Sequence, residues 1–320
     1  IFLSILTFFF IEKIFRNKNL EFNKVLVFII VSTILIFSYF FIVLFKDGKL
    51  NSINTSIELT KNSPIYNSEC KYSTSVKDYK TDDYFKNQFD KCIDKHKKFI
   101  LVLGDSHSID LFNILSKYSS DDEFIVGFNK GGCRPNSKVS TKCHYLNSLK
   151  FIENYKKSIK HIFYNQKGSY FLTNIGNSNQ AGLSEFRELP INIIEIENSI
   201  NYLKLIHKIT NNVTFVGPHA EPNVELNRKN IINYYKNNIS FVDSTNNYLN
   251  EVDKKLEEVS KKNKLNYISQ IKIINFNFEE DFIVESKITY SDTDHFSSFG
   301  EYYFGKKLIL NSIIKSILKN

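Results

Sequence analysis

Apolar and polar positions alternate along most of the chain in blocks of two lengths. Short apolar runs, typical of buried strands, alternate with longer stretches in which apolar residues recur at helical spacing. The short runs cover residues 99–103, 124–128, 161–164, 213–216 and 265–268. The helical stretches cover residues 109–118, 146–159, 191–209, 247–262 and 299–318. This alternation predicts an α/β fold, a parallel sheet with helices on both faces in three layers.

The N-terminal part of the chain has a different pattern. Residues 25–45 contain no charged side chain and are long enough to cross a bilayer, so we predict one complete transmembrane helix there. Residues 1–11 are also apolar but too short to cross, and we interpret them as the end of another span. The basic residues between these segments predict that residues 13–24 are cytoplasmic and that the chain beyond Lys46 is external. A cleaved signal peptide is the alternative, but no small-residue cleavage site follows the apolar run.

Residues 49–95 are polar and rich in Asn, Ser, Lys and Asp, which predicts a linker and a disulfide-stapled loop. The chain therefore divides into a membrane part at 1–48, this linker at 49–95, and a catalytic domain at 96–320.

The four cysteines all lie on the predicted external side, where oxidised pairs are expected. Three pairings are possible, and the local one, Cys70 with Cys92 and Cys133 with Cys143, suits the order of the chain. Zinc binding is the alternative; it is disfavoured by the irregular spacing and by the lack of a Cys-x-x-Cys pair.

Composition limits the remaining possibilities. An apolar content of 42% with 24% charged residues excludes a disordered chain. The net charge of +8 is spread along the chain, which favours a solvated surface over attraction to anionic lipid or glycan. There is no phosphate-loop or dinucleotide motif, and we expect no nucleic-acid partner. The absence of Met from all 320 residues predicts that sequence is missing upstream.

The candidate chemistry begins after the first predicted strand, with Gly104-Asp105-Ser106-His107-Ser108. Ligands bind at the carboxyl ends of parallel strands, and Gly104 permits a sharp turn that leaves Ser106 at the start of a helix. The alternative is that Asp105 and Ser106 only cap that helix. Far downstream, Asp292-x-x-His295 favours a serine nucleophile, because histidine is the usual base for a serine hydroxyl. Residues 217–222 follow a strand at the same edge and either line a substrate cleft or form a plain turn.

These blocks resemble a known family. Gly-Asp-Ser-His-Ser, then Gly132-Cys133 after the second strand, then Asp292-x-x-His295 with Phe296-Ser297 and Gly300, are similar to the SGNH hydrolases. They resemble in particular the extracytoplasmic domain fused to membrane acyltransferases of the type-three family. Residues 10–16, Phe-Ile-Glu-Lys-Ile-Phe-Arg, look like the end of that family's membrane domain, with Ile where Pro is usual.

The resemblance implies roles for individual residues. Ser106 would be the nucleophile, His295 the general base and Asp292 the carboxylate that orients it. Asp294 is the less suitable partner because adjacent residues on an extended segment point in opposite directions. The oxyanion hole would consist of the amides of Ser106 and Gly132 and the side chain of Asn165, although Tyr164-Asn165-Gln166 departs from the family's Gly-x-Asn. His107 would support the site, and no metal is expected.

The resemblance also implies a function, O-acyl transfer. The upstream membrane domain would take an acetyl group from acetyl coenzyme A, and Ser106 would pass it to a sugar hydroxyl of a cell-envelope polysaccharide, such as lipopolysaccharide O-antigen or peptidoglycan. No cofactor is expected on this part of the chain. The expected partners are the polysaccharide acceptor, membrane lipid and the upstream acyltransferase domain, in a multi-pass protein of the inner membrane whose catalytic domain is periplasmic. The alternatives are a membrane-tethered carbohydrate esterase with the same triad and a catalytically silent glycan-binding module.

Overall fold

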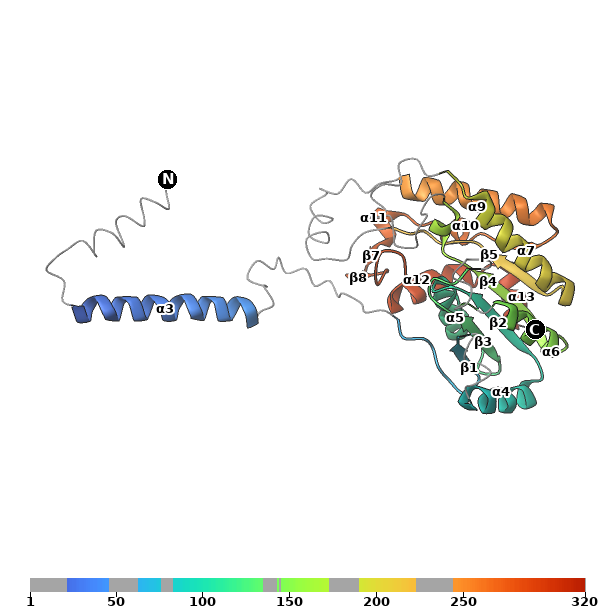
Figure 1. The fold of residues 1–320 in the computed structure, drawn as a ribbon, viewed down its shortest axis with the longest axis horizontal. Helices are drawn as coiled ribbons and strands as arrows, with labels where there is room; N and C mark the ends of the chain where they lie inside the picture. Colours follow the sequence, from blue (N-terminus) through green and yellow to red (C-terminus); the bar gives the residue numbers. More distant parts are fainter. Residues whose placement is uncertain are drawn as a thin grey trace. The chain divides into compact units, whose positions relative to one another are not determined.

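The computed structural model describes residues 22–45, 63–75, 83–134, 143, 145–172, 190–222 and 244–319. It divides the chain into two compact units, Ile1–Ser56 and Ile57–Asn320. The described part of the first unit is one helix, α3 (Phe22–Phe45), at the place where the sequence predicts one (Figure 1). No helix in the described ranges is both long and apolar enough to cross a membrane. The transmembrane role of residues 25–45 stays a prediction, and residues 1–11 and the motif at 10–16 lie outside the described residues.

The second unit is built on a six-stranded parallel sheet in the order β1-β3-β2-β4-β5-β6. The strands are β1 (Lys71–Thr74), β2 (Phe99–Gly104), β3 (Ile125–Asn129), β4 (Ile159–Asn165), β5 (Val213–Val216) and β6 (Asn266–Ile268). All five strands that the sequence predicts are present. The chain passes from β2 outward to β3 and then back across β2 to β4, so β2 and β4 are neighbours whose connections leave in opposite directions. Such a reversal is where an open α/β sheet binds ligands.

Helices cover both faces of the sheet, as the strand–helix alternation predicts (Figure 1). Along β2, Phe99, Leu101 and Leu103 pack into one core and Ile100 and Val102 into the other, so every position of the strand is apolar. The helices of the first core are α4 (Asp83–His96), α6 (Tyr145–Tyr155), α7 (Ile193–Ile209) and α9 (Ser244–Lys262). Those of the second are α5 (His107–Tyr118), α10 (Gln270–Ile274), α12 (Ser298–Leu308) and α13 (Ser312–Lys319).

The segment predicted as a linker and loop, residues 49–95, differs from that expectation where the structure describes it. It contributes the edge strand β1 and the helix α4 to the sheet domain. Phe85, Phe89 and Cys92 recur at helical spacing and are buried on one face of α4. The ring of Phe89 lies 5.3 Å from that of Phe99 on β2, which ties the helix to the central strands.

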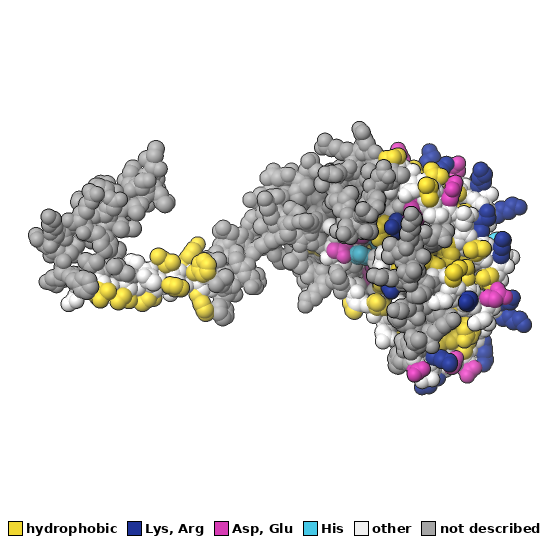
Figure 2. Space-filling model, in the orientation of Figure 1, with side chains coloured by type: hydrophobic (Ala, Val, Ile, Leu, Met, Phe, Trp, Pro, Cys, Tyr) yellow, Lys and Arg dark blue, Asp and Glu magenta, His cyan; other side chains and the backbone are white. Residues whose placement is uncertain are grey.

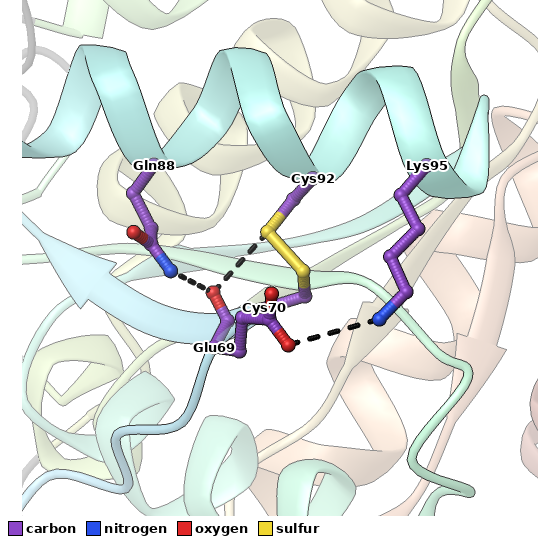
Figure 3. Close-up of a disulfide and its surroundings, with 5 residues drawn as sticks. All are labelled: Glu69, Cys70, Gln88, Cys92 and Lys95. Atoms are coloured by element: carbon purple, nitrogen blue, oxygen red, sulfur yellow. Dashed lines mark hydrogen bonds and ion pairs between the residues drawn. A yellow bond between two sulfur atoms is a disulfide. The ribbon is translucent and has the colours of Figure 1, made fainter.

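Both locally predicted disulfides are present, Cys70–Cys92 and Cys133–Cys143. The first joins the residue before β1 to α4, and Gln88 Nε2 donates to the carbonyl of Glu69 beside it (Figure 3). The exposed Lys95 also lies 3.7 Å from the Glu69 carboxylate. At this exposed site the ion pair adds little, so β1 and α4 are held together by the disulfide and by the packing of Tyr72 on Phe85, whose rings lie 5.5 Å apart.

The C-terminal helix predicted over 299–318 is two helices, α12 and α13. The side chain of Asn311 accepts hydrogen bonds from the amides of Ile313 and Ile314 and so caps the second helix. Before α12 the chain forms the short helix α11 (Phe278–Asp281) and the hairpin of β7 (Ile283–Val284) and β8 (Lys287–Ile288). The helix predicted at 146–159 ends at Tyr155, because β4 begins at Ile159.

Basic side chains on the visible face are interspersed with acidic and apolar ones (Figure 2). The basic residues behind the net charge of +8 are therefore spread over this face as solvated side chains and do not form one concentrated patch on it.

Candidate active site

Strand β2 ends in a turn that only glycine can form. Gly104 has a φ of +149°, and a Cβ on it would lie 1.8 Å from the carbonyl oxygen of Asn165. Gly104 and Asn165 are partners in the β2–β4 pairing, so the two strand ends approach too closely for any side chain. The turn therefore brings the start of α5 to the edge of the sheet beside the end of β4.

The side chain of Asp105 fixes this turn through two hydrogen bonds. Its buried carboxylate accepts a hydrogen bond from the amide of His107 at 2.9 Å and one from the amide of Lys167 at 2.9 Å. The first bond satisfies an amide in the first turn of α5, and the second holds the loop that follows β4. The alternative interpretation was that Asp105 and Ser106 both cap α5. In the structure Asp105 takes this role.

Ser106 occupies the N-cap position of α5 without capping it. Its φ and ψ are −64° and −31°, and its side chain makes no cap hydrogen bond. Among the described residues, the Ser106 hydroxyl takes part in no hydrogen bond, and the residue is partly exposed. A serine at an N-cap normally bonds to the helix amides, so this free hydroxyl is available for other chemistry.

The Asp292–His295 segment forms the carboxylate–imidazole pair that its spacing predicts. His295 Nδ1 lies 2.8 and 3.0 Å from the two carboxylate oxygens of Asp292. Asp292 also accepts from the amides of His295 at 2.7 Å and Asp294 at 3.0 Å, which fixes its own orientation. With Nδ1–H donating to Asp292, the lone pair of the neutral imidazole is on Nε2, and that buried atom has no hydrogen-bond partner among the described residues.

The two catalytic segments meet through their neighbouring residues. His107, next to Ser106, contacts Asp294, next to His295, with 3.0 Å between Nε2 and Oδ2 across 187 positions of sequence. The rings of His107 and His295 are 5.0 Å apart, edge to face. No hydrogen bond joins Ser106 and His295 in the described structure; unliganded sites often have this bond long, and it shortens when substrate binds.

Two glycines after β3 approach the nucleophile. A Cβ on Gly131 would lie 3.9 Å from the Cβ of Ser106, and Gly132 has a left-handed φ of +72°. The amides of Gly131 and Gly132 take part in no backbone hydrogen bond of the described residues, and both glycines are exposed. Their amides are therefore candidate oxyanion donors. Gly132 was predicted for this role, and the structure adds Gly131, which lies nearer to Ser106.

Asn165 does not supply the third donor in this arrangement. It is fully buried, and its Nδ2 donates to the carbonyls of Val216 at 2.9 Å and Gly217 at 3.1 Å. Both amide hydrogens are therefore used to join β4 to the end of β5. In this arrangement Asn165 has a structural role, and its oxyanion role stays a prediction.

The charges around His295 change its affinity for a proton. Burial alone would lower the pKa of His295, but the hydrogen bond that it donates to Asp292 and the negative charges of Asp110 and Asp294 raise this pKa to about 9. Burial raises the pKa of Asp110 to about 7; its Oδ2 accepts from the amide of Phe296 at 3.2 Å. Although burial opposes it, the hydrogen bond to His295 holds the pKa of Asp292 below its usual range.

His107, Asp294 and His295 place their donor atoms within 4.8 Å of one another, a spacing that a metal ion could bridge. However, Asp294 Oδ2 already contacts His107 and lies 2.6 Å from Lys167 Nζ, a cation that would repel a metal. We interpret the group as a hydrogen-bonded cluster and assign no metal to it.

The comparisons with known proteins agree with this geometry. Residues 70–309 match the family described as "SGNH domain (fused to AT3 domains)". The chain belongs to this SGNH family. Its members have an acyl-handling fold, and the sequence-based assignment is confirmed. No match was found among curated proteins.

The chain is also similar to solved structures. The periplasmic domain of a lipopolysaccharide acetyltransferase from Salmonella ser. Paratyphi A is 22% identical, with a TM-score of 0.52, over 71% of this chain and 87% of that one. A carbohydrate acetylesterase family member from Sinorhizobium meliloti is 8% identical, with a TM-score of 0.41, over 70% of this chain and 100% of that one. At these identities the likeness concerns the fold, and both transferases and esterases are among the proteins that match.

Lys167 was not among the residues predicted for this SGNH site, whereas His219 and Glu221 belong to residues 217–222, for which the sequence left a cleft lining or a plain turn open. Lys167 follows β4 and bonds to Asp294, while His219 and Glu221 follow β5 and are buried. His219 Nε2 lies 2.8 Å from the Asp294 carbonyl. The signal available was positional: each residue follows a predicted parallel strand, where side chains converge at one edge.

Proposed function

We propose that this SGNH domain is an O-acetyltransferase that forms an acetyl ester on Ser106 and passes it to a sugar hydroxyl of a cell-envelope polysaccharide. The observation that carries the proposal is the uncapped hydroxyl of Ser106, on the residue before His107, whose ring lies 5.0 Å from that of His295, a base whose Nδ1 is held by Asp292. A free nucleophile, an oriented imidazole and exposed glycine amides are the parts that acyl transfer needs.

The chemistry proceeds in two steps. The Ser106 oxygen attacks the acetyl carbonyl while His295 Nε2 takes its proton, and the oxyanion faces the amides of Ser106 and of Gly131 or Gly132. His295 then gives the proton to the leaving group as the carbon–oxygen bond breaks. In the second step the sugar hydroxyl loses its proton to His295, attacks the ester carbonyl and displaces Ser106, which recovers its proton.

The donor side of the proposal involves the membrane. Because the family is described as fused to AT3 domains, we propose that an upstream membrane domain takes the acetyl group from acetyl coenzyme A. The two disulfides favour an oxidising compartment, so we place the SGNH domain in the periplasm and its anchor in the inner membrane. The acceptor we propose is a polysaccharide such as lipopolysaccharide O-antigen or peptidoglycan.

The first experiment tests the nucleophile on the full 320-residue chain in detergent. A serine-directed fluorophosphonate should label Ser106, and 4-nitrophenyl acetate should be hydrolysed. Ser106→Ala should remove the label and lower hydrolysis by about a thousandfold or more. Ser316→Ala, an exposed serine on α13, is the matched control and should behave as the parent chain. Labelling at another serine would reject Ser106 as the nucleophile, and no labelling in a folded sample would reject serine chemistry.

The second experiment separates transfer from hydrolysis. The acylated chain is offered de-O-acetylated O-antigen polysaccharide or peptidoglycan fragments, and the products are analysed by mass spectrometry. The proposal expects acetylated saccharide and faster turnover of the donor ester. Release of acetate alone, at a rate independent of every acceptor, would support the esterase instead.

A further inference from the structure

Every polar atom of the Asp294 side chain and its carbonyl oxygen has a hydrogen-bond or ion-pair partner within the protein. Its Oδ2 lies 3.0 Å from His107 Nε2 and 2.6 Å from Lys167 Nζ. Its Oδ1 accepts from the hydroxyl of Thr293, and its carbonyl lies 2.8 Å from His219 Nε2. The side chain is only 5% exposed. We call Asp294, His107, Lys167 and His219 the Asp294 cluster.

The members of the Asp294 cluster come from four different segments. His107 is in the first turn of α5, Lys167 follows β4 and His219 follows β5. Asp294 therefore connects the segment that carries His295 to three strand ends of the sheet. The rings reinforce this connection: His107 stacks on His219 at 4.4 Å, and His219 stacks on Phe296 at 4.1 Å.

The sequence places His107 and Asp294 each beside one of the two proposed catalytic residues. His107 directly follows Ser106, and Asp294 directly precedes His295. A shift of the His107–Asp294 contact would therefore move the imidazole relative to the hydroxyl. Asp292 alone cannot prevent this, because it belongs to the same short segment as His295 and moves with it.

We propose that Asp294 is a positioning residue: through His107, Lys167 and His219 it fixes the segment that carries His295, and so determines where His295 Nε2 points during both proton transfers. The inference rests on the proposed acyl transfer. Asp292 orients the ring within its segment, and Asp294 places that segment against the nucleophile.

The charges in the cluster make the carboxylate form of Asp294 necessary. Burial would raise its pKa, but the hydrogen bond from His107 and the charge of Lys167 hold the pKa of Asp294 well below its usual range. Burial opposes protonation of His107, yet its bond to Asp294 raises the pKa of that imidazole. Asparagine at this position would remove the carboxylate that lies 2.6 Å from the mostly buried Lys167 Nζ, and so weaken the compensation of that cation.

Asp294 Oδ1 also lies 3.8 Å from His295 Nδ1, so its charge favours the protonated form of the base. The other ionisable groups that face His295 come from its own segment, from the β2–α5 turn and from the loop after β5. They are Asp292, Asp105, His107, Asp110 and His219, with Lys167 and Glu221 beyond Asp294.

The test compares the parent chain with Asp294→Asn in the 320-residue protein. The pH profile of kcat/KM for 4-nitrophenyl acetate should change in two ways. The plateau should fall about tenfold or more because the base is misplaced, and the acidic limb should move to lower pH by about half a unit or more because a nearby negative charge is lost. KM should change less than kcat.

Two further variants separate positioning from folding. Asp281→Asn removes a buried carboxylate that bonds to Tyr303 and Lys307 away from the site. This variant should lower the melting temperature and leave the acidic limb of the kcat/KM profile at the same pH. Adding Lys167→Met to Asp294→Asn removes the cation that has lost its ion-pair partner, and should recover melting temperature without restoring the plateau of kcat/KM.

A titration of His295 by nuclear magnetic resonance makes the result independent of turnover. If the parent chain neither hydrolyses esters nor binds the fluorophosphonate, the proposed function fails, while the titration still tests the cluster. An unchanged His295 titration in Asp294→Asn, or a loss of rate only in proportion to the folded fraction, would overturn the positioning role.

Discussion

The carboxylate of Asp105 accepts a hydrogen bond from the backbone amide of Lys167 at 2.9 Å. This bond crosses the point where the connections of β2 and β4 leave in opposite directions, and it joins the turn that carries Ser106 to the loop that carries Lys167. The motif residue next to the nucleophile is thus a structural support for both sides of the site.

Asp105→Asn should therefore lower both stability and rate. Asparagine keeps one acceptor oxygen, so either the amide of His107 or that of Lys167 loses its buried partner. We expect a loss of about 1–3 kcal/mol in the free energy of unfolding, measured with urea, together with slower ester hydrolysis. Asp94→Asn, an exposed position on α4, is the control. Equal stability of the two variants would contradict this role.

Ester hydrolysis should rise with pH across the neutral range. His295 must be neutral to take a proton, and its pKa is raised to about 9. Below that value kcat/KM should increase roughly tenfold per pH unit, and it should level off above it. Because the folded pKa exceeds the unfolded value, this group stabilises the fold fully below the unfolded pKa, and the contribution is lost as pH rises through about 9. A profile flat from neutral pH upward would contradict the assignment.

Asp292→Asn should shift that profile. The hydrogen bond to Asp292 is the largest influence that raises the pKa of His295, so its loss should move the acidic limb to lower pH. The plateau should fall by about a hundredfold or more, because a neutral amide no longer holds the imidazole with Nδ1 protonated. Glu285→Gln, in the turn between β7 and β8, is a control that should leave both limb and plateau unchanged. A lower plateau with an unmoved limb would argue against this electrostatic role.

The central sheet could be predicted because its strands consist mostly of apolar residues. Strands β2 to β5 are buried on both faces, which gives short apolar runs, although His161 interrupts β4 and Thr214 interrupts β5. Strand β1 escaped prediction because Lys71 is polar yet 3% exposed. Its Nζ donates to the carbonyls of Ser116 and Ser119 at the end of α5, both at 3.1 Å. A lysine that binds a helix terminus from a strand leaves no periodic signal in the sequence.

The site was predictable where its parts are local. Asp292 and His295 are three positions apart, and their contact follows from that spacing. The sequence also indicated that Asp294 points away from the imidazole. What lies on that other side, His107 and Lys167, depends on how distant strand ends pack, and a single sequence does not contain that information.

Gly104→Ala should destabilise the domain severely. The added Cβ would overlap the Asn165 carbonyl at 1.8 Å, and the backbone conformation itself is unfavourable for alanine. We expect a loss of at least about 3 kcal/mol or no folded protein. Gly131→Ala is the matched comparison: among the described residues its Cβ meets only Ser106 Cβ, at 3.9 Å, so the chain should fold normally but react more slowly. Circular dichroism and ester hydrolysis on both variants test this contrast.

Removing one disulfide should lower stability alone, and removing the other should lower both stability and catalysis. Each closes a short loop, with sequence separations of 22 and 10, and each should contribute about 3 kcal/mol to unfolding free energy. Replacing Cys70 and Cys92 by serine should lower the urea midpoint and leave kcat of the folded protein unchanged, because β1 is two strands away from Ser106.

Cys133 directly follows the exposed glycine amides, and its carbonyl accepts from Tyr145 Oη at 2.9 Å. The pair Cys133→Ser and Cys143→Ser should therefore lower kcat as well as the midpoint. Equal kcat for both double variants, measured where each is fully folded, would show that the glycine loop does not need its disulfide to stabilise the oxyanion.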